Sequence, residues 1–340
     1  MRIVATLFLF LFAIRLLGST TEALTPVLRR TLDRVVVSDL SALGLGWFAS
    51  YALANGSIVA ALSVSLFSSG LIVPSQLFFM VVGSRLGGAA VVVFIGAFDY
   101  LNAEVDSVRE ALSLGLLTFL LTHSVYLPVT VLGYLSLPVL PLEAGVGRPT
   151  ADIGGGFSGV VSTVTDGVVE VLGPGVAFLV ALGCIAVSLR LFDHTLEAID
   201  TDRLRQRYLV ELGDRWVSFA VGLLITGVTT SVAFSLGVVV PLYNRGHVKT
   251  TEIMPFVLGA NIGTLVDTLI VAVALDTPVG VRTVLAIVGL SAGVSLLPLL
   301  FYKPYRSLIT SVHAEIMRSI AVFVGVLLSL LVVPLTLFVL

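Results

Sequence analysis

The chain has 340 residues, of which 57% are hydrophobic and 12% are charged, and its formal net charge is −2. A soluble domain cannot bury so much apolar surface, and the small net charge indicates neither a nucleic acid nor a strongly charged surface as a partner. The single cysteine, Cys184, excludes an intrachain disulfide. Apolar runs of about 18 or more residues recur, which is the length that a helix needs to cross a bilayer. The sequence therefore predicts an all-α, multi-pass protein of the cell membrane.

The first half of the chain begins with a predicted span at about 1–18, followed by a charged amphipathic stretch from Glu22 to Asp39. A long apolar region interrupted by Gly, Ser and Asn covers 41–98, and a further span is predicted at 111–134. The basic start and apolar middle of the first segment also fit a signal peptide. The internal repeat described below favours a retained structural helix instead.

The second half shows the same order of segments. A span is predicted at 173–191, a charged stretch from Asp193 to Arg215, an apolar region at 217–275 and a span at 281–302, and a last helix covers 319–340. The expected organisation has about 8–10 membrane segments. It divides the chain into membrane repeat 1 (1–134), a Gly-rich extracytoplasmic loop (135–172), membrane repeat 2 (173–302), and a cytoplasmic loop with a C-terminal membrane helix (303–340).

An internal repeat relates the two halves. Residues 46–88 align without a gap on 222–264, mostly through identical glycines, and IRLLGSTTEAL (14–24) matches LRLFDHTLEAI (189–199). Polar interruptions in apolar segments survive in lipid only when they are buried in protein or line a water-filled cavity. Broken or re-entrant helices at matching places in two repeats are typical of a transport site at the repeat interface.

The distribution of basic residues predicts the orientation of the two repeats. Basic side chains gather at 191–216 and 303–318, which are therefore expected in the cytoplasm, whereas the acidic loop 143–172 is expected outside. Counting spans from these points makes the repeats inverted relative to each other. The acidic loop 99–110 and the basic residues of 29–34 run against this assignment.

The motif GANIGT (259–264) and its degenerate mate GSRLGG (83–88) carry the polar groups of the repeat. Glycines let a backbone turn and approach a ligand closely, and Asn and Thr supply neutral oxygens that suit a hard cation. Backbone N–H groups at a helix start suit phosphate. The alternative is that the small residues serve helix packing of the GxxxG type.

GANIGT, preceded by a Ser/Thr-rich segment that ends in VVPL, resembles the type II sodium–phosphate cotransporter family. The resemblance implies two inverted repeats, each with a QSSS-type segment in a re-entrant hairpin, inorganic phosphate as substrate and Na⁺ as coupling ion, without another cofactor. By position the QSSS-type segments fall on 54–57 and 230–233, which keep neither the Gln nor all the serines. The family's pairing of an Arg with an Asn-containing helix survives only in part, as Arg109 with Thr118 and Arg282 with Ser291.

Arg85 is the main departure from the family, because it stands where the second copy has Asn261. A charge at membrane depth is costly, and three interpretations stay open: an anion receptor, a fixed positive charge where a sodium ion would bind, or an interfacial anchor. If the pseudo-twofold axis brings the two motifs together, Arg85 and Asp267 pair. The candidate residues for binding substrate or ion are Asn55, Ser57, Arg85, Thr230, Ser231, Asn261, Thr264 and Asp267.

These features predict a secondary transporter that moves inorganic phosphate or a similar anion by alternating access, driven by an ion gradient because no ATP-binding motif is present. The alternatives are a transport-inactive scaffold or regulatory protein of the same fold, and a carrier for another anion that is not coupled to sodium. A membrane enzyme is disfavoured because no nucleophile–base pair or metal-ligand spacing stands out. His123 fits a proton relay, but the mid-helix position favours a packed histidine.

Overall fold

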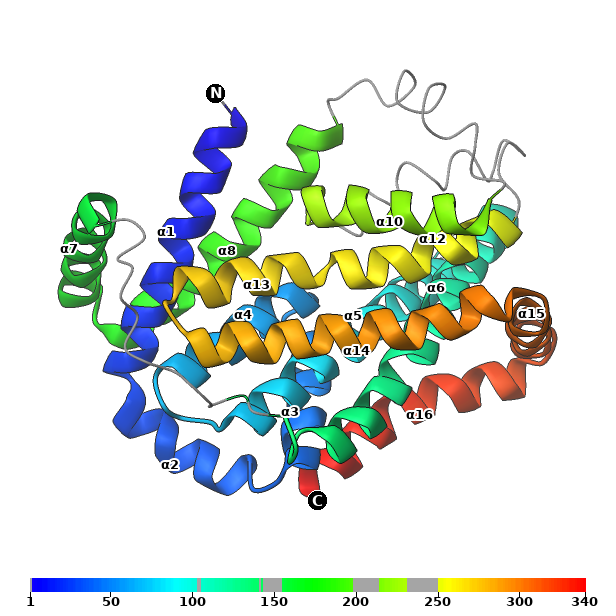
Figure 1. The fold of residues 1–340 in the computed structure, drawn as a ribbon, viewed down its shortest axis with the longest axis horizontal. Coiled ribbons are helices and arrows are strands. Elements are labelled where there is room, and N and C mark those ends of the chain that lie inside the picture. The colour runs from blue at the N-terminus through cyan, green and yellow to red at the C-terminus, as the bar shows by residue number, and fades with distance from the viewer. Residues whose placement is uncertain (1, 103–104, 141, 143–154, 198–213, 231–249) are drawn as a thin grey trace.

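The computed structural model describes residues 2–102, 105–140, 142, 155–197, 214–230 and 250–340, and these residues form helices and short connections without a strand. Figure 1 shows how the helices lie together. Their bounds are α1 (Arg2–Ala23), α2 (Thr25–Val35), α3 (Asp39–Ala52), α4 (Gly56–Ser68), α5 (Pro74–Asn102), α6 (Val105–Ser136), α7 (Gly155–Leu172), α8 (Pro174–Glu197), α10 (Arg215–Thr229), α12 (Thr250–Gly263), α13 (Leu265–Ala274), α14 (Pro278–Leu300), α15 (Tyr302–Arg318) and α16 (Ile320–Val339).

The all-α membrane fold predicted from the sequence is confirmed. Within the described residues, seven helical segments are long and apolar enough to span a bilayer, or eight if α2 and α3, which meet at a bend of 112°, are counted as one broken span. The number of spans, seven or eight, reaches the predicted range of about 8–10 membrane segments only at its lower end. The reason is that α4 and α10 are apolar but short: 13 residues of helix rise about 20 Å, against about 30 Å of hydrocarbon.

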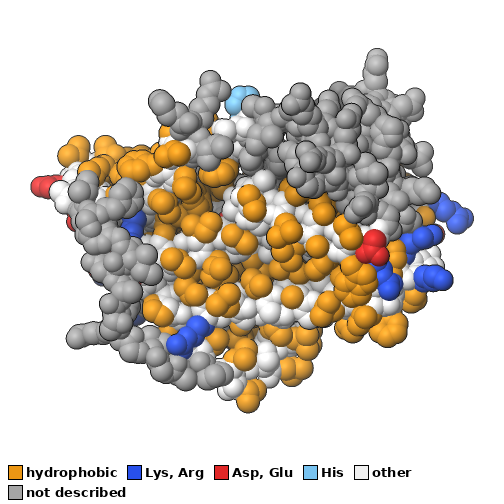
Figure 2. Space-filling view, turned by 45° about the horizontal axis from the view of Figure 1, so that its top comes forward, with side chains coloured by type: hydrophobic (Ala, Val, Ile, Leu, Met, Phe, Trp, Pro, Cys, Tyr) orange, Lys and Arg blue, Asp and Glu red, His pale blue; other side chains and the backbone are white. Residues whose placement is uncertain are grey.

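The outer surface is that of a protein surrounded by lipid. Figure 2 shows a broad apolar face on which charged side chains stand mainly near the edges. Large apolar side chains such as Val228, Leu297 and Val339 are exposed, and only 11% of the span in α16 is buried inside the protein. An exposed apolar area of this extent is stable only against a bilayer or another hydrophobic partner.

The same close contact between two helices occurs in each repeat. A Cβ atom added at Gly46 of α3 would lie 2.2 Å from the carbonyl oxygen of Met80 in α5, and one added at the equivalent Gly222 of α10 would lie 2.1 Å from the carbonyl oxygen of Phe256 in α12. These are backbone-to-backbone approaches that a glycine at the interface permits. The pairs α3–α5 and α10–α12 therefore cross in the same way, whereas the inverted membrane orientation stays a prediction.

The motif glycines take part in this packing, which corrects one interpretation of GANIGT. A Cβ at Gly259 would lie 2.0 Å from the carbonyl oxygen of Phe219, and one at the equivalent Gly83 would lie 2.2 Å from that of Leu43. Gly259 lies inside α12 and lets α10 approach; it does not open a turn toward a ligand. The small-residue packing considered as an alternative therefore accounts for this glycine, and the polar members of the motif must be judged separately.

Two predicted loops, 135–172 and the loop after the span 281–302, contain helices. Residues 155–172, placed in the Gly-rich loop, form α7, and residues 302–318 form α15. In α7 the buried Val161 and Thr165 are four residues apart and so share one helix face, and the Thr165 hydroxyl lies 3.4 Å from that of Ser19 in α1. The apolar positions of α7 and α15 follow the helical period, which the Gly content of one and the charges of the other obscured.

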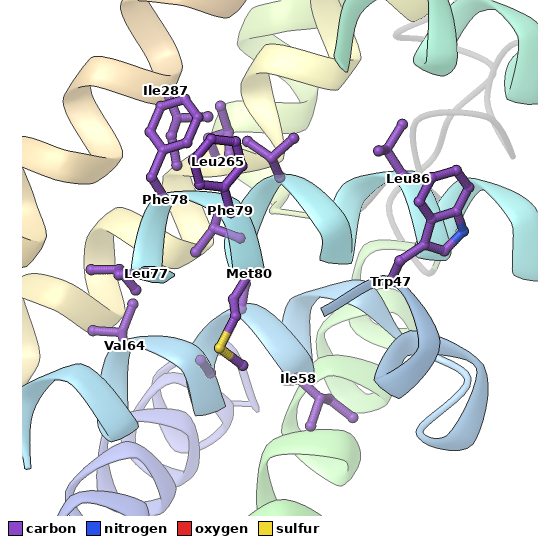
Figure 3. Close-up of a cluster of buried hydrophobic side chains, with 14 of the residues drawn as sticks. Trp47, Ile58, Val64, Leu77, Phe78, Phe79, Met80, Leu86, Leu265 and Ile287 are labelled. Atoms are coloured by element: carbon purple, nitrogen blue, oxygen red, sulfur yellow. The ribbon is translucent and has the colours of Figure 1, made fainter. Parts of the chain in front are cut away.

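Helix α5 lies at the centre of the fold and joins the two halves. Its span, Pro74–Phe94, is 78% buried. Phe78 and Phe79 belong to a core cluster that includes Leu265 of α13 and Ile287 of α14, as Figure 3 shows. A polar side chain near the middle of this span, such as Arg85, is thus held in the protein interior.

Candidate functional site

A buried ion pair connects the two halves. Arg85 of α5 donates from Nη2 to Oδ1 of Asp267 in α13 at 2.9 Å, and the two side chains are 7% and 3% exposed. The same Nη2 donates to the hydroxyl of Thr268, which in turn donates to Asp267 Oδ1 at 2.8 Å. Arg85 therefore points into the protein, and its interpretation as an interfacial anchor is wrong.

The pair leaves hydrogen-bonding capacity unused. Arg85 Nε and Asp267 Oδ2 are buried, and neither has a hydrogen-bond partner among the described residues. The contact is therefore made through one nitrogen and one oxygen, whereas a guanidinium and a carboxylate can form two parallel bonds. Unsatisfied buried polar atoms are costly, and in a native site they call for an explanation such as a missing ligand or water.

A cavity of about 400 Å³ lies beside this pair. Its volume is within the range of small-molecule sites and leaves room for an inorganic ion with several waters. Six of the eight candidate residues from the sequence line it, and they come from both halves of the chain: Asn55, Ser57, Arg85, Thr230, Asn261 and Thr264. Asp267 is not a lining residue and reaches the cavity wall through Arg85, and Ser231 lies outside the described residues.

The first-copy QSSS-type segment forms the start of α4. Asn55 Oδ1 accepts from the backbone N–H groups of Ser57 and Ile58 at 2.8 and 3.1 Å, so this side chain caps the helix. Asn55, Gly56 and Ser57 all line the cavity, so the positive end of the α4 dipole faces it. This placement favours an anion in the cavity.

One face of α6 contributes polar groups that the sequence analysis did not select as site residues. Thr118, Thr122 and Tyr126 are spaced by four residues and line the cavity together. Thr122 donates to Asn261 Oδ1 at 2.9 Å, and the Tyr126 hydroxyl donates to the Asn261 carbonyl at 2.7 Å. The signal that could have found them is this polar stripe of period four within an otherwise apolar helix.

Three hydroxyl groups donate hydrogen bonds to Asn261, whereas the side-chain amide nitrogen of Asn261 has no acceptor among the described residues. Its carbonyl also accepts from the Thr264 hydroxyl at 2.7 Å, whereas its Nδ2 is buried and unpaired among the described atoms. Nδ2 and Arg85 Nε thus add N–H donors without partners next to the cavity. Donors without partners beside a positive charge are suited to an oxyanion.

The positions that the family resemblance pairs as an Arg with an Asn-containing helix do not come together at the cavity. Thr118 lines the cavity and Ser291 is buried, but Arg282 donates to the Leu142 carbonyl at 3.4 Å, and the side chain of Arg109 is outside the described part. His123 donates from Nδ1 to the Phe119 carbonyl at 3.0 Å, and its ring packs on that of Phe119. These contacts favour the packed histidine over the proton relay.

Comparison with known proteins supports the resemblance. A model of the Na⁺/Pi-cotransporter family matches residues 184–333. The uncharacterized protein YqeW of Bacillus subtilis strain 168 is 28% identical over 101 residues, which are 29% of this chain, and the match spans about a third (33%) of that protein. No solved structure matches the chain. Over residues 184–333, which are less than half of the chain, this protein is therefore similar to the Na⁺/Pi-cotransporter family.

Proposed function

We propose that this protein is a secondary transporter that moves inorganic phosphate, or a similar small oxyanion, through the cavity between its two halves by alternating access. The observation that carries the proposal is Arg85, a guanidinium near the middle of the span Pro74–Phe94 that lines this cavity. A buried arginine is costly in a membrane and is retained where it serves a substrate or ion. Its planar fork suits tetrahedral oxyanions.

The wall around Arg85 supports an anionic substrate. The start of α4 faces the cavity with its dipole, and Nδ2 of Asn261 is a further donor without a partner in the described residues. The hydroxyls of Thr118 and Ser57 can donate or accept as the ligand requires. No lining residue in the described part carries an acidic side chain, so repulsion of an anion is limited to Asp267, which Arg85 offsets.

Residues of both halves meet at the cavity, which is the placement that alternating access requires. Asn55, Ser57 and Arg85 come from the first half, and Thr230, Asn261 and Thr264 from the second. A rocking of one half against the other would change access to the site without dismantling either wall. Sodium is the coupling ion that the family resemblance implies.

The test is uptake of radiolabelled phosphate into proteoliposomes that contain the purified protein, under an inward gradient of Na⁺, of K⁺ or of protons. We expect gradient-driven accumulation that falls at least about tenfold in Arg85→Gln, because one charge-assisted contact contributes about 1.5–3 kcal/mol. Arg15→Gln is the matched control, since Arg15 forms a partly exposed pair with Asp276 and does not line the cavity. Folded protein that accumulates no phosphate under any gradient would support the scaffold alternative.

A further inference from the structure

The ion pair at the cavity wall has the arrangement of a coupling switch. Arg85 lines the cavity, whereas Asp267 is not among its lining residues and is 3% exposed. We infer that an oxyanion entering the cavity draws Arg85 away from Asp267, and that the released carboxylate then takes up one proton, so that anion and proton are carried together. This inference rests on the proposed function and names its coupling ion.

The pattern of hydrogen bonds supports this exchange of partners. A single nitrogen of Arg85 contacts both Asp267 and Thr268, so the pair can be broken by the movement of one group. Arg85 Nε has no partner among the described residues and is available to the anion before the pair opens. Asp267 Oδ2 is likewise without a partner there and is available to the proton. Thr268 donates to Oδ1 at 2.8 Å and holds the carboxyl group in place throughout.

The charge balance explains why transport of the two species would be coupled. The empty site is neutral, with Arg85 positive and Asp267 negative. A singly charged anion alone would leave one uncompensated negative charge, and a proton alone would leave one positive charge. With both bound, the anion compensates Arg85 and Asp267 is neutral.

The proton passes from water to a carboxylate oxygen, and no other covalent bond changes. Because an unpaired charge in a low-dielectric interior is strongly unfavourable, only the empty and the doubly loaded states cross the barrier readily.

Among the described residues, few other charges stand around Asp267 to take part. On α6, the Tyr126 hydroxyl is the titratable group that lines the cavity together with Arg85, and it donates to the Asn261 carbonyl. Helix α4 has no charged residue. The described charged side chains on the other helices packed against α13 stand near helix ends or already have partners: Arg15, paired with Asp276, and Glu22 of α1, Arg215 at the start of α10, and Arg282 of α14, bonded to Leu142.

A proton fits this carboxylate better than a metal cation. Hard cations require several oxygen ligands at once. The nearby hydroxyls of Tyr126 and Thr264 already donate to the carbonyl of Asn261, and the Thr268 hydroxyl donates to Asp267 itself. Protonation needs neither a coordination shell nor a new cavity.

Proton uptake on binding gives the direct test. Inorganic phosphate is added to the purified protein in weakly buffered detergent solution containing a pH indicator, for wild type and for Asp267→Asn. We expect wild type to take up about one proton more per bound phosphate than Asp267→Asn. The comparison cancels the proton equilibrium of phosphate itself. Asp276→Asn, which alters the partly exposed second pair, should match wild type.

Transport provides the second readout. An inward proton gradient should accelerate phosphate uptake several-fold in wild type, whereas Asp267→Asn should still exchange phosphate but lose the acceleration. Equal proton uptake by wild type and Asp267→Asn, with phosphate bound by both, overturns the inference. Acceleration by a Na⁺ gradient alone that disappears in Asp267→Asn also overturns it, because the carboxylate then holds sodium. If wild type binds no phosphate, the proposed function fails first.

A second variant, which keeps both charges of the ion pair, tests the inference if Asp267→Asn does not fold. Thr268→Val removes the hydroxyl that donates to the carboxylate and so disfavours its charged form. The pH at which phosphate-linked proton uptake is half-maximal should then rise relative to wild type. An unchanged midpoint in Thr268→Val, with phosphate binding intact, would contradict the role of Asp267.

Discussion

Ala54 and Thr230, which are equivalent in the two repeats, both adopt the left-handed backbone conformation, with φ of 49° and 51°. Each follows a helix that begins after an equivalent cap, since Ser38 accepts from a backbone N–H at the start of α3 and Asp214 does so at the start of α10. Neither residue is a glycine, so each carries the steric cost of this conformation. The chain thus breaks at the same place in both halves, next to the cavity.

The left-handed turn at Ala54 should be sensitive to branching. Ala54→Val is expected to lower the free energy of unfolding by about 1–3 kcal/mol, because a β-branched residue is strongly disfavoured at positive φ. The control is Ala52→Val, which changes an exposed position at the end of α3 where the backbone is helical. Thermal unfolding in detergent measures both variants. Equal effects in the two would argue against backbone strain as the cause.

The crossing of α10 and α12 should not tolerate a methyl group at Gly259. A Cβ there would lie 2.0 Å from the Phe219 carbonyl oxygen, so Gly259→Ala must push the helices apart at a cost of about 1–3 kcal/mol. Gly289→Ala of α14 has open space within 4 Å of the added carbon and should be neutral or slightly stabilising. Melting temperatures of the purified variants distinguish them, and an unaltered Gly259→Ala protein would contradict the close packing.

The polar stripe of α6 should position Asn261. Thr122→Val removes a donor to Asn261 Oδ1 at 2.9 Å and is expected to raise the apparent KM for phosphate uptake several-fold, in line with about 1 kcal/mol for a neutral hydrogen bond. Thr130→Val, on the same helix, removes only a bond to the Tyr126 carbonyl and should leave KM near the wild-type value. Similar KM values for the two variants would show that Asn261 does not depend on Thr122.

Helices α2 and α15 are expected on opposite sides of the membrane. The basic residues of 303–318 predict that α15 is on the cytoplasmic side and α2 outside. Helix α15 precedes α16, and the far end of α16 packs on α3, where a Cβ at Gly44 would lie 2.5 Å from the backbone nitrogen of Phe338. In a Cys184→Ser background, a membrane-impermeant thiol reagent should label Thr31→Cys from outside and Ser307→Cys only after access to the cytoplasmic side. Labelling of both from one side would contradict the predicted orientation.

The sequence by itself determined the class of the protein and the repeat. Composition decides that lipid surrounds the chain, because the apolar fraction exceeds what a soluble fold can bury. The repeat was readable from the glycines of 46–88 and 222–264, because only a glycine fits where two helix backbones touch, as at Gly46 and Gly222. The helices α7, within the loop predicted at 135–172, and α15, within the loop predicted at 303–318, were missed because glycine and charge content masked a helical period.

Only the tertiary structure decided which polar groups converge. Arg85 and Asp267 are 182 positions apart, and the repeat predicted their pairing only on the condition that the two motifs meet; the packing of α5 and α13 places them 2.9 Å from each other. Thr122 and Tyr126 belong to a helix whose sequence is mostly apolar, and their role depends on which face α6 turns toward Asn261. Sequence reports composition and short-range periodicity, whereas a site between two repeats is built from contacts across the chain that appear only when the helices pack.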